Sequence, residues 1–340
     1  MIGKQSNFSW LSCGGEAHVA LISERAAGRL VVTAKKVYLL ANRIEMPRLQ
    51  DEAVRGLGAE PLLYEWYEDG ALKALKAVVD PKKVISDTGE YGTQSKPELF
   101  APLRYSLHPD EIKRLRELSI RAEGAMNLTC GAIQPGITEH IIAGHLSEEC
   151  LYVGVTPAVA LIAVDERVRR YRHPIPTSKK LKRYAMLVLC ARQHGLIVSV
   201  TRLVHFGKLP ADLRQRHNAV CAVDAAFISN TRIGTPIREI FRRGVDAYAA
   251  QGFADEWKLH HQGGPCSYEP RDYVGTPTAP GTVLENQAFA WNPSIAGTKS
   301  EDTILATTKG PQILTEAKDW PMVKVDAYGK IISRPDILVR

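Results

Sequence analysis

The chain has 340 residues, of which 45% are hydrophobic and 24% are charged. These proportions are typical of globular proteins, and they exclude a disordered tail, a fibrous repeat and a small disulfide-rich scaffold. The length predicts two domains. No uncharged apolar run approaches the ~18 residues that a membrane helix needs, and the N-terminus lacks the apolar core of a signal peptide. We therefore expect a cytoplasmic protein without a membrane partner.

Cysteine and charge patterns narrow the class further. Six cysteines are scattered without CxxC spacing, which predicts reduced thiols rather than zinc knuckles or a disulfide framework. The net charge of +7 is partly concentrated between Arg167 and Arg183. Few aromatic residues interleave these charges, so we expect no nucleic-acid partner. The segment is either a solvated loop or an anion-attracting rim beside a site.

The first hundred residues alternate short apolar runs with a helical pattern, which is typical of a small α/β domain. Turn-forming residues at 91–97 predict a linker after it. We therefore place a first domain at residues 1–100. Its expected strands are 19–22, 29–33, 36–40 and 61–66, and its expected helix is 46–57.

A second domain is expected at residues 107–340. Pro109 opens a predicted helix whose apolar residues recur at helical spacing. The segments 137–144 and 237–244 both carry Ile, Glu and Gly at the same offsets, which indicates an internal duplication. The expected strands that follow are 185–191, 196–200, 287–291 and 303–307.

A series of ordered motifs in this second domain resembles the pita-bread-fold family, which includes methionine aminopeptidase, aminopeptidase P, prolidase and creatinase. The motifs are His173, Cys190, Val198-Ser-Val-Thr-Arg202, His261-Gln-Gly-Gly264, Glu269-Pro270, Trp291-Asn-Pro293, Ser300-Glu-Asp302 and Leu314-Thr315. The resemblance implies an α+β protein: a C-terminal pita-bread fold preceded by a small α/β domain like that of the creatinase, aminopeptidase P and prolidase branch. It also implies a homodimer.

The resemblance implies a metal site that this chain has largely lost. In the metallopeptidases of the family, two aspartates, one histidine and two glutamates hold two divalent ions. The corresponding positions here are Cys190, Ser199, His261, Asn292 and Glu301. Because a paired site needs several carboxylates, we expect no metal cofactor. The alternative is one divalent ion held by Cys190, His261 and Glu301, since thiolate, imidazole and carboxylate all suit zinc.

Creatinase, in the same family, hydrolyses a C–N bond without a metal, and His173 stands at the position of its catalytic histidine. An imidazole titrates near neutral pH, so it can move a proton between water and a leaving nitrogen. The substrate is then expected to be a small amino-acid-like or amidine-like molecule. The expected catalytic residues are His173, His261, Glu269 and Glu301. The expected substrate-binding residues are His260, Tyr268, Arg271, Asn292 and Lys299.

Other functions stay open at this point. One is an Xaa-Pro peptidase with an altered single-metal site. Another is a catalytically inactive peptide-binding protein, as in some histone-chaperone subunits of this fold. A covalent mechanism through Cys190 or Cys266 is a further alternative, although no local pattern predicts an activated thiol at either residue. Buried structural histidines and solvated surface cations are the non-functional interpretation of the same residues.

Overall fold

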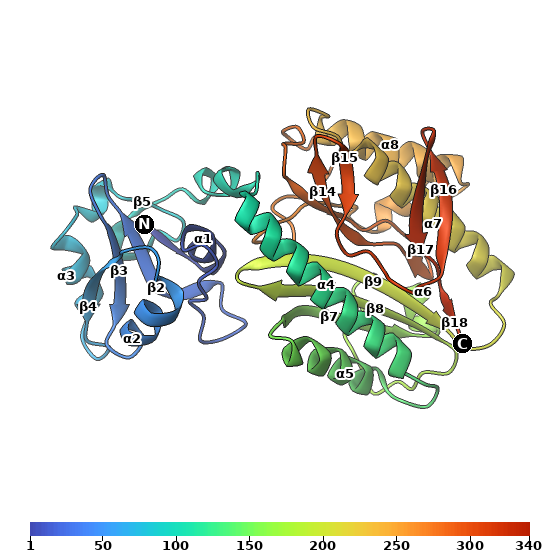
Figure 1. Ribbon diagram of the computed structural model, residues 1–340, viewed down its shortest axis with the longest axis horizontal. Coiled ribbons are helices and arrows are strands. Elements are labelled where there is room, and N and C mark those ends of the chain that lie inside the picture. Colours follow the sequence, from blue (N-terminus) through green and yellow to red (C-terminus); the bar gives the residue numbers. More distant parts are fainter. The chain divides into compact units, whose positions relative to one another are not determined.

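The computed structural model describes residues 1–340 and divides them into two units (Figure 1). The first unit comprises residues 1–104 with 194–196, and the second comprises residues 105–193 with 197–340. No helix is both long and apolar enough to cross a membrane.

The first unit is built on a four-stranded sheet in the order β1-β2-β3-β4. β2 is antiparallel to both of its neighbours, β1 and β3, and β4 is parallel to β3. Phe8, Leu30, Leu39 and Leu49 are fully buried and form the centre of its core. Its elements are β1 (Ile2–Lys4), α1 (Gln5–Leu11), β2 (Arg25–Val32), β3 (Val37–Asn42), α2 (Met46–Arg48), β4 (Glu60–Tyr64), α3 (Gly70–Lys76), β5 (Ile85–Ser86) and β6 (Gln94–Ser95).

Two predictions for the first unit need correction. Residues 19–22 form an exposed turn instead of a strand, and Ile22 is 97% exposed. An apolar run becomes a strand only where a neighbouring strand satisfies its backbone groups, and this run has no such neighbour. The helix expected at 46–57 is limited to α2 and a π-helical turn at Leu49–Ala53. The strands expected at 29–33, 36–40 and 61–66 are confirmed as β2, β3 and β4.

The second unit contains two four-stranded sheets, in the orders β18-β9-β8-β7 and β10-β11-β14-β15. The strands expected from the sequence are confirmed as β8, β9, β11 and β14. Its helices are α4 (Pro109–Ala132), α5 (Glu139–Tyr152), α6 (Glu166–Arg170), α7 (Ala211–Asn230) and α8 (Ile237–Ala250). Its strands are β7 (Thr156–Val164), β8 (Tyr184–Gln193), β9 (Leu196–His205), β10 (Gly263–Pro265), β11 (Ala288–Trp291), β12 (Ser294–Ile295), β13 (Thr298–Lys299), β14 (Asp302–Thr307), β15 (Gly310–Ile313), β16 (Met322–Ala327), β17 (Lys330–Pro335) and β18 (Leu338–Val339).

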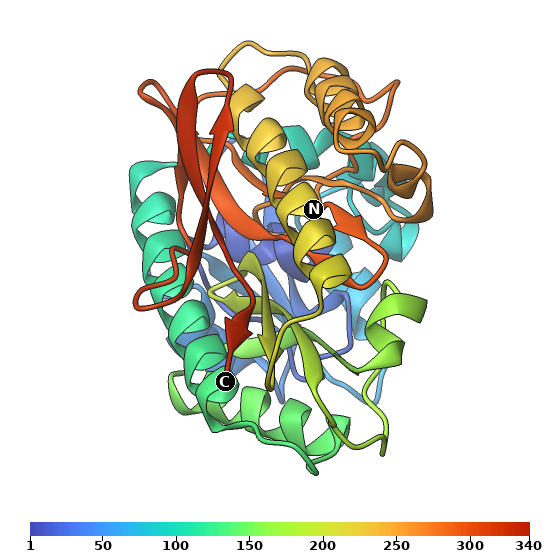
Figure 2. The same cartoon turned by 90° about the vertical axis from the view of Figure 1, so that its right-hand side faces the viewer.

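A long helix followed by a 14-residue helix precedes the strands of each sheet. These pairs are α4 with α5 and α7 with α8 (Figure 2). α5 packs on β7 and on α4, whereas α8 packs on α7. The segments 137–144 and 237–244 therefore lie at the same place in the two halves, as a duplication predicts.

Two arginines and two aspartates, which belong to α7, β9, β14 and β17, form a buried ion cluster. Arg334 Nη2 lies 2.7 Å from Asp224 Oδ2 and 2.6 Å from Asp302 Oδ2. Arg202 Nη2 lies 3.0 Å from Asp302 Oδ1. Because a buried charge without its partner is strongly destabilising, this cluster holds strands from both halves in one arrangement.

The duplicated glycines provide a matched test of helix packing. A Cβ on Gly244 of α8 would lie 2.1 Å from Cζ of Phe227 on α7, whereas a Cβ on Gly144 of α5 would meet no atom within 4 Å. We expect Gly244→Ala to lower the free energy of unfolding by about 1–3 kcal/mol because the helices must separate. Gly144→Ala should raise it by up to about 1 kcal/mol. Urea unfolding measures both, and equal effects would contradict the packing of α7 on α8.

Glu123 of α4 predicts a pH-dependent stability. Burial raises the pKa of this carboxyl to about 7, and Arg202 offsets the rise only in part. A carboxyl whose pKa is higher in the folded than in the unfolded chain loses stability as the pH rises between the two values. We expect Glu123→Gln to unfold at a higher temperature than the wild type at pH 8, with a smaller difference at pH 5. A difference that stays constant between these pH values would contradict the raised pKa.

Candidate active site

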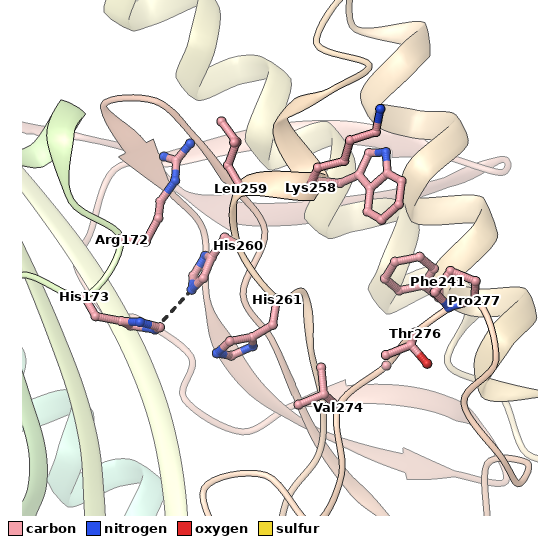
Figure 3. A pocket seen from close by; sticks show the side chains of 12 residues that line it. Arg172, His173, Phe241, Lys258, Leu259, His260, His261, Val274, Thr276 and Pro277 are labelled. Carbon is pink, nitrogen blue, oxygen red and sulfur yellow. Dashed lines mark hydrogen bonds between the residues drawn. The ribbon is translucent and has the colours of Figure 1, made fainter.

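Three histidines from two distant segments converge in the second unit and are called here the histidine cluster: His173, His260 and His261 (Figure 3). His173 lies in the loop that follows α6. His260 and His261 connect the short 3-10 helix Glu256–Leu259 to β10. Their potential ligand nitrogens all lie within 4.8 Å of one another. Each of these residues was predicted separately from the sequence to belong to the site, and the fold brings them together.

Short contacts hold the buried ring of His260 and orient the exposed rings of His173 and His261. Nε2 of His260 lies 3.3 Å from Nε2 of His173, and its Nδ1 lies 3.0 Å from Oγ of Ser294. The Gly263 backbone N–H donates to Nδ1 of His261 over 3.3 Å. Gly263 adopts a φ of +84°, and a Cβ there would lie 2.1 Å from the Ala290 carbonyl oxygen. This glycine therefore permits the close approach of β10 and β11 that positions His261.

The surroundings favour neutral imidazoles throughout the cluster. Burial, followed by the charge of Lys299, lowers the pKa of His260 to about 2. Burial, followed by the charge of Arg271, lowers the pKa of His261 to about 4. The pKa of His173 is also lowered, first by burial and then by the charge of Lys299. Neutral rings have an unprotonated nitrogen, so the cluster offers lone pairs to a proton or a metal ion.

The cluster forms one wall of a cavity of about 450 Å³ (Figure 3). Phe241 and Trp257 lie edge to face, with ring centroids 5.5 Å apart, on its apolar side. Arg172 Nη2 lies 2.6 Å from Glu256 Oε2 at the cavity edge. The full lining is Arg172, His173, Phe241, Trp257, Lys258, Leu259, His260, His261, Val274, Gly275, Thr276 and Pro277. The arrangement resembles a small-molecule site, which is mostly apolar with a few converging polar groups.

Glu301 is buried outside this lining and is held by two cations. Its Oε2 lies 2.7 Å from Nζ of Lys299, and its Oε1 lies 2.9 Å from Nη2 of Arg271. Thr201 Oγ1 donates to Oε2 over 2.6 Å. Burial alone would raise the pKa of Glu301, but the two cations hold it at about 2. Lys299 and Arg271, which were expected to bind substrate, thus pair with a carboxylate of the protein itself.

The positions where the resembling metallopeptidases carry metal ligands do not fit a pair of divalent ions. Cys190 Sγ lies 3.4 Å from Ser199 Oγ, and Arg271 Nη1 donates to the same hydroxyl over 3.1 Å. Burial raises the pKa of the Cys190 thiol. Asn292 is buried, and its Oδ1 has no hydrogen-bond partner. One carboxylate and the positive Arg271 side chain replace the several carboxylates that two ions require.

Other residues expected at the site lie away from the cavity. The Tyr268 hydroxyl donates to Glu111 Oε1 of α4 over 2.6 Å. Glu269 is half-buried in the turn after β10 and is absent from the cavity lining. Cys266 is buried, and burial raises the pKa of its thiol to about 12. Since a reactive cysteine needs a lowered pKa and some exposure, neither Cys266 nor Cys190 resembles a nucleophile.

Residues 113–308 match the sequence model of metallopeptidase family M24, which covers more than half of the chain. The chain belongs to metallopeptidase family M24. Among individual proteins, it is 25% identical over 222 residues to an uncharacterised peptidase of Staphylococcus haemolyticus and spans 63% of that protein's length. An uncharacterised peptidase of Staphylococcus aureus is 22% identical over 221 residues, with the same 63% coverage of each chain.

Solved structures confirm the expected α+β class and the pita-bread fold of this M24 chain. An Xaa-Pro dipeptidase from Bacillus anthracis superposes with a TM-score of 0.74 at 16% identity, covering 100% of this chain and 94% of the other. A prolidase from Pyrococcus horikoshii has a TM-score of 0.77 at 17% identity, covering 93% of each chain. At these identities the likeness establishes the fold alone.

Family membership corrects the expectation about cofactors. The sequence led us to expect no metal cofactor because most carboxylate ligands are missing. That expectation is contradicted, since the chain is a member of a metallopeptidase family and its structural neighbours include prolidases. The alternative single-ion set of Cys190, His261 and Glu301 is not the group that the structure gathers, because His261 lies with His173 and His260 instead.

Much of the cavity was not identified from the sequence. Arg172, Phe241, Trp257, Val274 and Pro277 line it but belong to none of the motifs that carry the resemblance. Arg172 stands beside His173 in the charge-rich segment that suggested the rim of a site. The sequence around the aromatic residues and Pro277 does not indicate whether they line a cavity or pack in an ordinary hydrophobic core.

The Glu301 network gives a prediction about stability. Removing the carboxylate by Glu301→Gln leaves two largely buried cations without their partner, which should cost about 3–5 kcal/mol of unfolding free energy. Lys299→Met should cost less, because Arg271 and Thr201 still hold Glu301. Urea unfolding of the two variants measures the difference. A larger loss in Lys299→Met than in Glu301→Gln would contradict this account.

Proposed function

We propose that this M24 chain hydrolyses a C–N bond in a small peptide, and that proline-containing dipeptides are its first candidate substrates. One observation carries the proposal: three imidazoles converge on the wall of a cavity whose opposite side is apolar. The names of the structural neighbours, an Xaa-Pro dipeptidase and a prolidase, suggest the kind of bond.

The cavity suits a substrate of dipeptide size. Its volume of about 450 Å³ lies within the roughly 300–1,000 Å³ range of small-molecule sites. Phe241 and Trp257 offer ring faces to an apolar side chain or a proline ring. Arg172 and Lys258 supply positive charge at the edge of the cavity, although each also pairs with a carboxylate of the protein. In this proposal the apolar wall binds the substrate and the histidine cluster provides the reacting groups.

One observation favours a second function, peptide binding without hydrolysis. The carboxylate site of the resembling metallopeptidases is filled here by Arg271, Ser199 and the Lys299–Glu301 pair. A protein that keeps the cavity but has lost that site could hold a peptide without cleaving it. The two functions differ in one measurable property, the turnover of a bound peptide.

Substitution of His261 tests the proposal directly. We expect the wild type to hydrolyse at least one member of a panel of Xaa-Pro, Pro-Xaa and apolar dipeptides, measured by release of free amino acids. His261→Gln should lower kcat/KM by at least ~100-fold because it removes one of the three imidazoles at the reacting end of the cavity. His145→Gln changes an exposed histidine of α5 outside the cavity and should leave the rate unchanged.

Trp257→Ala separates substrate binding from the reaction. We expect this variant to raise KM more than it lowers kcat, because it removes a ring from the apolar wall. Peptides that bind to the wild type and to His145→Gln without any hydrolysis, in buffers with and without added divalent metal, would refute the enzyme and support the peptide-binding function. The expected homodimer stays a prediction that sedimentation can check.

A further inference from the structure

We propose that the histidine cluster binds one zinc ion, through nitrogens of His173, His260 and His261, at a place that shares only His261 with the metal site of the resembling metallopeptidases. This inference deepens the proposed function, since it names the group that the reacting end of the cavity holds. The inference is tested by metal content and coordination, whereas the proposed function is tested by peptide hydrolysis. Either one can therefore be refuted without the other.

The spacing of the rings matches the geometry of a zinc site. Two nitrogens that each lie about 2.0–2.1 Å from a tetrahedral ion are roughly 3.3 Å apart. Nε2 of His173 and Nε2 of His260 are 3.3 Å apart. The third imidazole, of His261, lies within 4.8 Å of both. His173 and His261 are exposed, so modest side-chain rotation can bring the third nitrogen into the coordination sphere.

A polar contact behind the cluster orients its buried ring. Nδ1 of His260 lies 3.0 Å from Oγ of Ser294, which leaves Nε2 directed at His173 (Figure 3). Histidine ligands usually have such a partner on their second nitrogen, and loss of the partner lowers metal affinity by about 10–100-fold. His260 is only 7% exposed, so its ring is held by the protein before any ion binds.

The donor set selects the metal. Three neutral imidazoles suit zinc and other late transition metals, whereas magnesium, calcium and manganese prefer oxygen ligands. Three histidines with an open fourth position also form the standard ligand set of one class of catalytic zinc site.

The charges around the cluster oppose a bare dication. Lys299 and Arg271 carry two positive charges near the rings, and Glu301 neutralises one of them. A zinc ion here therefore needs an anion in its fourth position, such as hydroxide, chloride or the carboxylate of a peptide. The same surplus charge would attract a substrate carboxylate toward the ion.

This assignment changes the role expected for His173. A ring nitrogen that holds an ion cannot also carry the proton of the reaction. If zinc binds, His173 acts as a metal ligand. His173 can act as the expected proton shuttle only if no metal binds.

Zinc titration of the chelator-treated protein tests the inference. We expect one zinc ion per chain by equilibrium dialysis and elemental analysis. His173→Ala and His261→Ala should each weaken binding by at least ~10-fold, and Ser294→Ala should weaken it by about 10–100-fold. His145→Ala is the matched control and should bind zinc as the wild type does. Circular dichroism confirms that each variant is folded.

Cobalt substitution and Cys190→Ala distinguish this site from the alternative set of Cys190, His261 and Glu301. We expect the Co²⁺ protein to show visible absorption bands of a four-coordinate ion without a thiolate charge-transfer band, and Cys190→Ala to bind zinc normally. A thiolate band together with loss of zinc in Cys190→Ala would overturn the inference. So would the absence of bound zinc in the wild type, or zinc binding that none of the histidine variants weakens.

Discussion

The interaction on which the centre of the second unit depends is the pairing of Glu301 with Lys299 and Arg271. All three groups are largely removed from water, so their charges interact strongly and none can be changed without a response from the others. The carboxylate also accepts a hydrogen bond from Thr201 on β9. Glu301, which lies between β13 and β14, is thereby joined to β9 through Thr201 and to the turn that follows β10 through Arg271.

This network also determines what the neighbouring cavity can do. Two cations against one carboxylate leave one positive charge in excess, and that charge lowers the pKa of the three histidines in addition to the effect of burial. The imidazoles are therefore neutral at physiological pH. A divalent ion cannot share Glu301 with Lys299 and Arg271 in the observed arrangement, so the neutral nitrogens facing the cavity are the better donors.

The sequence predicted the fold well because the fold depends on features that are local or ordered along the chain. The strand patterns that became β8, β9, β11 and β14 and the helix that begins at Pro109 could each be recognised from short segments. The strand expected at 19–22 failed because its apolar character alone does not provide a neighbouring strand. The repeat of Ile, Glu and Gly at 137–144 and 237–244 predicted equivalent helices, but not that Gly244 packs on Phe227 while Gly144 is open.

The site was predicted less completely because its geometry depends on long-range contacts. His173, His260 and His261 were each selected from the sequence, yet their convergence joins residues 87 positions apart along the chain. Arg271 and Lys299 were expected to bind substrate, but the sequence does not reveal that both pair with Glu301. The aromatic wall of the cavity carries no motif at all.

The expectation of a metal-free site came from the number of metal ligands that this chain has lost. The balance of charges around the remaining residues predicts metal binding better than that number does. In the resembling metallopeptidases, four carboxylates balance two divalent ions. Here three of those carboxylates are replaced by Cys190, Ser199 and Asn292, while Arg271 and Lys299 supply positive charge beside the one that remains. The interior is thus stable without the paired ions. Because Arg271 and Lys299 already balance Glu301, this carboxylate needs no metal ion. The neutral imidazole nitrogens have no such partner and stay available to a ligand. What enters the cavity must satisfy those nitrogens and the excess positive charge together, and a zinc ion carrying an anion satisfies both.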